Sequence, residues 1–523
     1  MTIRIYVAEI AAWDPALPGT RSLYFATHGL ATAAGDTPAA TYIAGRISQP
    51  ASIRREIFAG SRIGGRSRVS LGSMILRNED GGLDHLAGYA FDGRPVTIRV
   101  GDAGTAYPAG FATLFQGVMD QVEFRRREVE IRLRDRALEL EVPLQDSRYA
   151  GTSTAAGGIE GTADDLKDKV KPWGRGRLFE VPPAYVNSAK LIFQAHDGAA
   201  ASIDAVYVGG NAVTAGAAHA SQAALESASV TPGQYDSWLA QSVFRLQTEP
   251  QKAVTCDIAI GATAADRTVA AIARHLVESR AGIATADLAI ADLAALDAAN
   301  AAEIGYWTDR DGVTVAEALD RVSASIGAYW WFDRQGRFRM ARLAEPAGTP
   351  ALTLKLPGGD AVLGEGDAAL TAFEFLPVEL PVWRVALGYR HIELVQRSGL
   401  AGAALSDEAR APYLAEEYRI AKAEDAAVLT AHPGARELRL DTRLVATAAA
   451  AAEAARLLAL LKVERQKLRV TVRVDQGQAD SIDLGRVVRL QTGRYGLAAG
   501  KDFLVIGQEL DLRRNRAELI LWG

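Results

Sequence analysis

The sequence predicts a multidomain, β-rich α+β protein in which two antiparallel β-barrel domains are joined by smaller α+β domains. Three observations support this prediction. The chain has 523 residues, too many for a single hydrophobic core. Short runs of alternating apolar and polar residues fill its beginning and its end, whereas two segments in the middle have the period of an amphipathic helix. A pattern near residue 100 also returns near the C-terminus, which indicates an internal repeat.

Residues 1–150 are expected to form the first barrel domain. Period-two runs such as IRIYVAEI, TYIAGRIS, RPVTIRVGD and EVEIRLRDRAL follow one another at short intervals, as in a sandwich or barrel. Asp-Gly pairs are strong signals for tight turns between strands, and the chain has them at 80–81 and 92–93.

Residues 151–265 are expected to form a strand-rich connector domain, with strands in SAKLIFQAHD, ASIDAVYVGG, SVFRLQT and AVTCDIAI. Its early stretch, IEGTADDLKDKVKPWGRGRLFEVPP at 159–183, suggests a phosphate-binding loop by composition. The spacing argues against one, because no Lys-Ser or Lys-Thr follows the glycines and G-x-G-x-x-G does not occur. We expect instead an exposed connector with a short helical turn at 164–170.

Residues 266–350 are expected to form a small α+β domain, a helix plus a β-hairpin. Two segments place apolar residues on one helical face: Val269, Ile272, Leu276 and Val277 in the first, and Val315, Leu319, Val322 and Ile326 in the second. The second helix leads into AYWWFDRQGRFRMARL, which predicts two strands joined across 333–336. Because adjacent strand residues face opposite sides, at least one of Trp330 and Trp331 is expected in the core.

Residues 351–523 are expected to form the second barrel domain, with an inserted excursion and a helix. The excursion is the polar, Ala-rich stretch at 399–430, to which the pattern assigns no structure. ATAAAAAEAARLLALLKVERQ predicts a strong helix whose buried stripe is Leu457, Leu458 and Leu461. The final strands are KLRVTVRVD, GRVVRLQTG, KDFLVIGQELDL and RAELILWG.

The end of the first domain and the end of the chain share a sequence pattern. GRPVTIRV followed by FQGVMDQVEFRRREVEIRL matches GRVVRLQTG followed by FLVIGQELDLRRNRAELIL. With one residue of slippage, Val118, Gln121, Arg125, Arg126, Glu130 and Leu133 fall on Val505, Gln508, Arg513, Arg514, Glu518 and Leu521. We therefore predict that one three-strand unit is used twice, and that three copies of such a chain present six similar barrels in a ring.

Composition narrows the class of protein. Hydrophobic residues make up 49% and charged residues 23%, as in folded soluble proteins. No apolar run is long enough to cross a bilayer, and charge interrupts the apolar start, so we expect folding in a cytosol and no membrane span. The net charge of -5 argues against a surface that wraps nucleic acid, but not against a duct through which DNA passes.

No catalytic or cofactor motif stands out. Cys256 lies in an apolar strand pattern, which predicts a buried thiol, and a single cysteine excludes an internal disulfide. The seven histidines never take a zinc spacing, and no G-x-S-x-G occurs. The HDG at 196–198 could be half of a catalytic dyad, but a strand-ending turn explains it more simply. A carboxylate pair for glycoside cleavage stays open, because its two acids can come from any two loops. We expect no catalytic residue, no cofactor and no metal.

The chain resembles the baseplate hub or tail-tip proteins of tailed bacteriophages and of gene transfer agents. NEDGGLDHL and LFQGVMDQVEF carry the likeness at the start, DDLKDKVKPWGRGRLFEVPPAYVNSAKLIFQAHDGAAASIDAVYVGG in the middle, and SIDLGRVVRL with FLVIGQELDLRRNRAELILWG at the end. The resemblance implies two tail-tube-like barrels, a ring of three chains beneath a sixfold tube, and a place in the virion after assembly in the bacterial cytoplasm. The implied partners are the tail tube or distal tail protein, the tape-measure protein, fibre or spike proteins, and DNA passing through the lumen.

The resemblance also gives the stretch at 159–183 a role. It implies an ordered connector packed against neighbouring domains or chains, with Lys167, Lys169, Lys171 and Trp173 as candidate interface residues. Two alternatives stay open: a tail-associated glycan-binding adhesin that uses exposed aromatic residues such as Tyr306, Trp307 or Trp330, and a cell-wall hydrolase.

Overall fold

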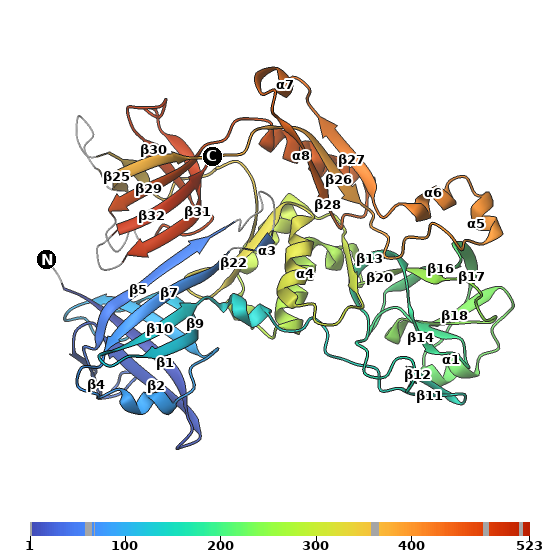
Figure 1. The fold of residues 1–523 in the computed structure, drawn as a ribbon, viewed down its shortest axis with the longest axis horizontal. Helices are drawn as coiled ribbons and strands as arrows, with labels where there is room; N and C mark the ends of the chain where they lie inside the picture. The colour runs from blue at the N-terminus through green and yellow to red at the C-terminus, as the bar shows by residue number, and fades with distance from the viewer. Residues whose placement is uncertain are drawn as a thin grey trace.

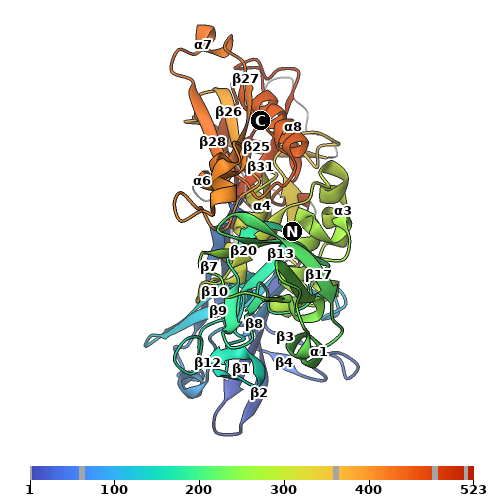
Figure 2. The same ribbon diagram turned by 90° about the vertical axis from the view of Figure 1, so that its right-hand side faces the viewer.

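The computed structural model describes residues 3–57, 65–66, 68–356, 364, 366–473, 481–511 and 516–523. Two β-sheets built from the ends of the chain lie on one side of the molecule, a group of helices lies at its centre, and a third large sheet lies on the other side (Figure 1). The view turned by 90° shows β27 (Arg419–Glu424) at one end of the elongated chain and β1 (Arg4–Asp14) with β2 (Gly19–Ala26) at the other (Figure 2).

The N-terminal residues form an open, half-barrel sheet. Its strands run in the order β2-β1-β8-β9-β10-β7-β5. Their inward apolar residues, such as Ile98, Met119 and Ile131, form one buried core, which is what the alternating sequence predicts. Gly81 and Gly93 have φ of +68° and +67°, as the predicted Asp-Gly turns require. The remaining elements of this region are β3 (Leu30–Ala31), β4 (Tyr42–Ile43), β5 (Ile47–Glu56), β6 (Gly65–Arg66), β7 (Arg68–Arg77), β8 (Pro95–Asp102), β9 (Ala112–Phe124) and β10 (Glu128–Arg134).

The C-terminal residues form a closed barrel. The strand order is β31-β30-β24-β25-β29-β32, and β32 pairs again with β31 to close the sheet. Val470, Phe503 and Leu519 are among the fully buried residues of its core. The strands are β24 (Thr353–Lys355), β25 (Asp367–Leu376), β29 (Lys467–Arg473), β30 (Val487–Gln491), β31 (Lys501–Asp511) and β32 (Arg516–Trp522). The predicted fold class is therefore confirmed, although one of the two units is an open half-barrel.

The two sheets repeat one strand plan. In the half-barrel the order is β1-β8-β9-β10-β7-β5, and in the barrel the strands at the same places in the sequence have the order β24-β30-β31-β32-β29-β25. The last five strands of each series pair in antiparallel fashion throughout. β24 departs from the plan, because it runs parallel to both of its neighbours, whereas β1 is antiparallel to β8. The duplication thus covers all strands of the barrel and every strand of the half-barrel except β2.

The third large sheet follows the half-barrel in the chain. Its order is β14-β15-β19-β18-β17-β16-β20-β13-β21. The expected strands are present, but the expectation of an exposed connector at 159–183 is wrong for its second half, because residues 173–181 form a largely buried strand inside this sheet. Residues 163–168 form turns, with no helix. The elements are β11 (Thr152–Thr154), β12 (Gly157–Thr162), β13 (Trp173–Val181), β14 (Ala184–Asn187), β15 (Ile192–Gln194), β16 (Ser202–Val208), β17 (Asn211–Ala218), α1 (Gln222–Ser227), β18 (Gln234–Trp238), β19 (Val243–Leu246), β20 (Val254–Ile260) and β21 (Gly305–Thr308).

Helices and a hairpin form the centre of the molecule. The helices are α2 (Val269–His275), continued by a π-helical turn over Leu276–Arg280, α3 (Ile290–Ala299) and α4 (Val315–Ala324), and the hairpin is β22 (Ala328–Phe332) with β23 (Phe338–Arg342). Every apolar residue predicted for the two helical faces is fully buried. Trp330 and Trp331 are both buried on opposite faces of β22, Trp330 in the helical core and Trp331 in the barrel core. This hairpin therefore belongs to both cores.

A small sheet and several helices interrupt the barrel sequence between β25 and β29. The sheet has the order β27-β26-β28 and packs on α8. The predicted buried residues Leu457, Leu458 and Leu461 of α8 are confirmed. Residues 399–430 contain α5, α6, β27 and α7. The bounds are β26 (Val382–Tyr389), α5 (Gly402–Ser406), α6 (Arg410–Ala415), α7 (Val428–Ala431), β28 (Arg436–Asp441) and α8 (Thr447–Leu461).

Candidate assembly junction

The two repeated sheets meet along one pair of strands. Residues 52–56 of β5 pair antiparallel with residues 507–511 of β31. β31 can accept β5 because it extends beyond its barrel neighbour β30, which pairs with residues 501–504 alone. The half-barrel and the barrel are therefore one continuous sheet within the chain.

A buried group of polar side chains holds this junction. Arg55, on β5, is 3% exposed and forms an ion pair with Asp483, which precedes β30. The same guanidinium donates to Oε1 of Gln508 on β31 at 2.9 Å and to the carbonyl oxygen of Phe332 at 3.4 Å. Gln508 in turn donates to the carbonyl oxygen of Ile482 at 3.0 Å. These contacts connect β5 to the barrel through side chains as well as backbone.

The charge of Asp483 balances two arginines. Arg334, from the turn between β22 and β23, places its Nε 4.0 Å from the second carboxylate oxygen. Burial would raise the pKa of Asp483, but the guanidiniums of Arg55 and Arg334 and the N–H of Leu484 outweigh it and lower the pKa. The carbonyl oxygen of Arg334 also accepts from the N–H of Gln116 on β9, at 2.8 Å. The junction therefore joins the half-barrel, the central hairpin and the barrel around one carboxylate.

In the half-barrel, β9 is the strand equivalent to β31, and its end has an edge like the one on which β31 pairs with β5. With Leu133 and Leu521 equivalent in the repeat, Ile131 corresponds to Leu519, so Val122, which pairs with Ile131, takes the position of Gln508, which pairs with Leu519. The ladder between β9 and β8 ends at Val118 and Pro95. In the described part of the chain, no strand pairs with residues 121–124 on that edge.

In the barrel, β25 is the strand equivalent to β5, and part of its outer edge is likewise open. Gly72 pairs with both Ile53 and Leu133, and Leu468 pairs with both Phe375 and Leu521. Since Leu133 and Leu521 are equivalent in the repeat, Phe375 on β25 takes the position of Ile53, a junction residue. β24 pairs with residues 367–369 alone, so within the described residues no strand covers this edge of β25 near Phe375. Phe375 is 41% exposed.

The residues predicted from the repeat differ in their surroundings. Gln508 is 2% exposed at the junction, whereas Gln121 is exposed at the open edge. Arg125 is exposed and pairs with Glu123 and Glu130 at 3.0 Å and 2.9 Å. Arg126 is exposed, and Arg513 and Arg514 lie outside the described residues. The repeat thus identifies two equivalent strand edges, on β9 and on β31, and the edge of β31 pairs with β5 of the same chain.

The lysines of the 159–183 stretch lie at the surface of the third sheet. Lys167 and Lys169 are exposed, and Lys169 borders a cavity of about 500 Å³ that Trp307 and Asp309 also line. Lys171 is half-buried and pairs with Glu160 at 2.7 Å. Their assignment as interface residues stays a prediction.

Trp173, the fourth candidate of that stretch, is 1% exposed and packs into the helical core. Its indole stacks on His275, with ring centroids 6.3 Å apart, and Arg280 lies over it at 5.7 Å. It connects β13 to α2 within one chain, and its assignment as an interface residue between domains or chains stays a prediction.

The groups that could have suggested catalysis have structural roles. His196 is 7% exposed, and its Nδ1 accepts the N–H of Gly174 at 3.1 Å. Burial lowers the pKa of His196 to about 4 and thus keeps the ring neutral at pH 7. In the described part of the chain, no three His, Cys, Asp or Glu side chains gather as a metal site requires.

Cys256 should be inert to thiol reagents in the folded protein. It is fully buried in β20, and burial raises the pKa of its thiol, so little thiolate forms near neutral pH. With a chromogenic disulfide reagent at pH 8, we expect no reaction in native buffer and one equivalent of thiol in denaturant. Rapid labelling of the native protein would contradict the buried placement.

The aromatic residues proposed for glycan binding are buried. Tyr306, Trp307 and Trp330 are 2%, 7% and 0% exposed. Trp307 donates its Nε1–H to the carbonyl oxygen of Ala195 at 2.9 Å, as a buried indole commonly does. The expectation that they are exposed is therefore wrong, and they offer no stacking platform.

No protein-family model and no curated protein matches the sequence. Comparison with solved structures finds similar chains. The tail protein from Neisseria meningitidis MC58 is 11% identical with a TM-score of 0.39, over 91% of this chain and 95% of that chain. The 43 kDa tail protein of prophage MuSo2 from Shewanella oneidensis is 12% identical with a TM-score of 0.39, over 99% and 98%. Both of these structures are of tail proteins. A chain in the virion of a native gene transfer agent particle is 16% identical with a TM-score of 0.43, over 74% and 92%.

No helix in the described residues is both long and apolar enough to span a membrane.

Proposed function

We propose that this protein is a structural component of a phage-type tail and that its copies join into a closed ring. One observation carries the proposal: the chain makes the contact between β5 and β31 once, and it leaves the equivalent segments of β25 and β9 open. When β25 of one copy pairs with β9 of the next copy, this contact between copies has the same strand arrangement as the contact between β5 and β31 within each copy. Sheet edges with unpaired backbone groups favour such additions.

This contact joins copies head to tail. A head-to-tail interface generates a ring when the rotation between copies closes. Three copies would then place six similar sheet units in a circle, alternately half-barrel and barrel. Such a ring has threefold symmetry but matches a sixfold tube on one face, which is the role of a baseplate hub at the tail tip.

The hub position, which the sequence resemblance implies, sets the expected partners. The tail tube or distal tail protein would lie on the sixfold face, and fibre or spike proteins on the other. The end of the tape-measure protein and the passing DNA would occupy the lumen. A net charge of -5 suits such a channel, because DNA that must slide through should not bind its wall.

Electron microscopy of the purified chain tests the proposal. We expect ring-shaped particles with threefold symmetry and six similar densities in one layer. In its own virion, the chain should lie at the tail tip. A protein that stays monomeric at micromolar concentration and is absent from the tail tip would contradict the proposal.

A further inference from the structure

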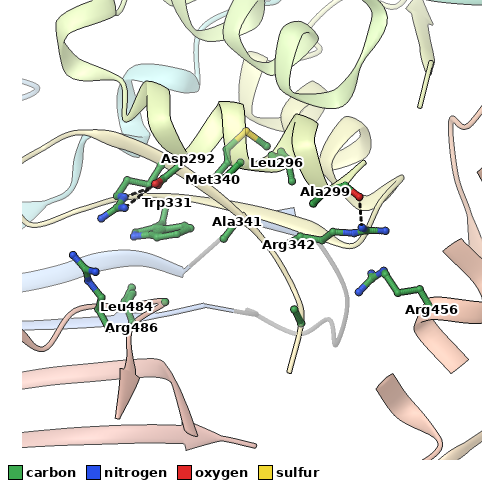
Figure 3. A pocket seen from close by; sticks show the side chains of 14 residues that line it. Asp292, Leu296, Ala299, Trp331, Met340, Ala341, Arg342, Arg456, Leu484 and Arg486 are labelled. Atoms are coloured by element: carbon green, nitrogen blue, oxygen red, sulfur yellow. Dashed lines mark hydrogen bonds and ion pairs between the residues drawn. The ribbon is translucent and has the colours of Figure 1, made fainter. Parts of the chain in front are cut away.

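We call the central helices α2–α4 and the hairpin of β22 and β23 the central module. A cavity of about 400 Å³ lies where this module, α8 and the barrel meet (Figure 3). Apolar side chains line its middle, among them Leu296 of α3, Met340 of β23 and Leu484 before β30. Charged side chains stand at both ends: Asp292 and Arg486 at one, Arg342 and Arg456 at the other. Arg339, which also lines the cavity, lies with Asp292, to which it donates. It borders the junction through Leu484, whose N–H donates to Asp483, but its described lining includes no residue of the open edges on β9 and β25.

The charges around this cavity do not balance. Arg339 is neutralised by Asp292, with two hydrogen bonds of 2.6 Å and 2.9 Å. Arg342 and Arg456 share a single carboxylate, that of the buried Glu453. Burial lowers the pKa of Arg342, and the carboxylate of Glu453 opposes this effect more strongly than Arg456 adds to it.

Arg486 adds a second uncompensated charge. Its side chain is exposed, and the described residues provide it with no hydrogen-bond or ion-pair partner. Trp331, which also lines the cavity, is 3% exposed, and its Nε1–H is buried with no acceptor in the described part of the chain. Buried donors are rarely left without a partner in native structures. One end of the cavity thus presents a guanidinium near an unsatisfied indole.

We propose that this cavity binds a peptide segment of a partner protein that carries carboxylates next to aliphatic side chains. The two excess arginine charges match two carboxylates, and the apolar middle matches the aliphatic side chain between them. A nucleic acid fits less well, because Trp331, the only aromatic residue that the described part of the chain contributes to the lining, is buried and offers no face on which a base can stack. This site goes beyond the proposed ring, since its occupant would contact the barrel and the central module of one chain.

A labelled peptide of alternating leucine and glutamate tests the proposal. Fluorescence anisotropy with the full-length protein at low salt should give saturable binding that weakens as salt is added, because the contacts are charge-assisted. The same peptide with glutamine in place of glutamate should not bind. Arg486→Glu should weaken binding at least about tenfold, because it replaces the unpaired cation by an anion. Arg494→Glu changes another exposed arginine of the barrel, outside the cavity, and should leave the affinity unchanged.

Three results would overturn the proposal. One is the absence of saturable binding at millimolar peptide. Another is an equal loss in Arg494→Glu, which would indicate attraction by overall charge alone. The third is a single-stranded oligonucleotide that displaces the peptide and depends on Arg486 in the same way, since the site would then recognise phosphate. None of these readouts depends on ring formation, so this test is independent of the proposed function.

Discussion

Replacing Asp483 by asparagine should destabilise the junction by about 3–5 kcal/mol, the usual cost of leaving buried charges unpaired. The carboxylate is 15% exposed and faces two arginines that are 3% and 9% exposed in their side chains. In the variant, Arg55 and Arg334 keep their burial but lose the negative charge that offsets it. Urea and thermal unfolding of the purified protein measure the effect.

Asp502→Asn provides the matched control. This residue pairs with Arg489 on the same barrel at 2.7 Å, but the two side chains are 23% and 44% exposed. Exposed pairs contribute about 0–1 kcal/mol, so the control should unfold almost as the natural protein does. Equal losses in the two variants would show that the junction carboxylate has no special role.

The same carboxylate gives the stability a defined pH dependence. The pKa of Asp483 is lower in the folded protein than in the unfolded chain. Its contribution is therefore complete above the unfolded value of about 3.9 and is lost as the pH falls through the folded value. The natural protein and Asp483→Asn should thus converge in stability at strongly acid pH and differ most near neutrality.

Sequence periodicity was enough to predict the elements that bury a single face, such as the two central helices. The helical faces around Ile272 and Leu319 follow from spacing alone, because residues three and four apart lie on one side of a helix. The strand β13 was missed because Gly174 and Gly176 are typical of loops. The structure requires one of them: Gly176 has φ +94°, and a Cβ there would lie 2.0 Å from the carbonyl oxygen of Ile304. A close backbone approach in a sheet is not visible in a single sequence.

The junction itself could not be predicted in this way. Arg55 and Asp483 are 428 positions apart, and neither belongs to the repeated pattern. The repeat did point to Gln121 and Gln508, but identical residues gave no sign that one is buried and the other exposed. That difference arises because β5 covers the edge beside Gln508, and because Gln121 lies opposite the exposed Arg132 whereas Gln508 lies opposite the buried Leu519, which are properties of the pairing and not of the local sequence.

Val122→Pro should break the proposed ring while leaving the chain folded. Arg125 donates its backbone N–H to Glu128, so by alternation the N–H of Val122 points away from β10, toward the open edge of β9. Proline removes that donor and is tolerated on edge strands. Losing this one backbone hydrogen bond, worth about 1 kcal/mol, should weaken each contact about fivefold and the three contacts of a ring together about a hundredfold. Mass photometry should then show monomers in place of rings, with the circular dichroism spectrum unchanged.

Ser22→Pro is the matched control for an edge proline. Ser22 lies on β2, the outermost strand of the half-barrel, and its N–H points outward by the same alternation, because Thr27 donates to Tyr6. This edge has no equivalent in the junction, so the ring should persist. If Ser22→Pro abolishes the rings and Val122→Pro leaves them intact, the contact between copies lies on the edge of β2 and not on that of β9.

Phe375→Glu tests the opposite side of the same contact. Phe375 is 41% exposed and forms an aromatic group with Phe373 and Tyr495, with ring centroids 5.1 Å from Tyr495. A carboxylate there would be buried without a partner when β25 meets β9 of the next copy, which costs far more than it does on an open surface. Because Val122 lies in the half-barrel and Phe375 in the barrel, a mixture of the two variants would retain one intact contact in each mixed pair. Dimers in that mixture, with monomers in each variant alone, are the result that head-to-tail pairing requires and that a symmetric interface does not give.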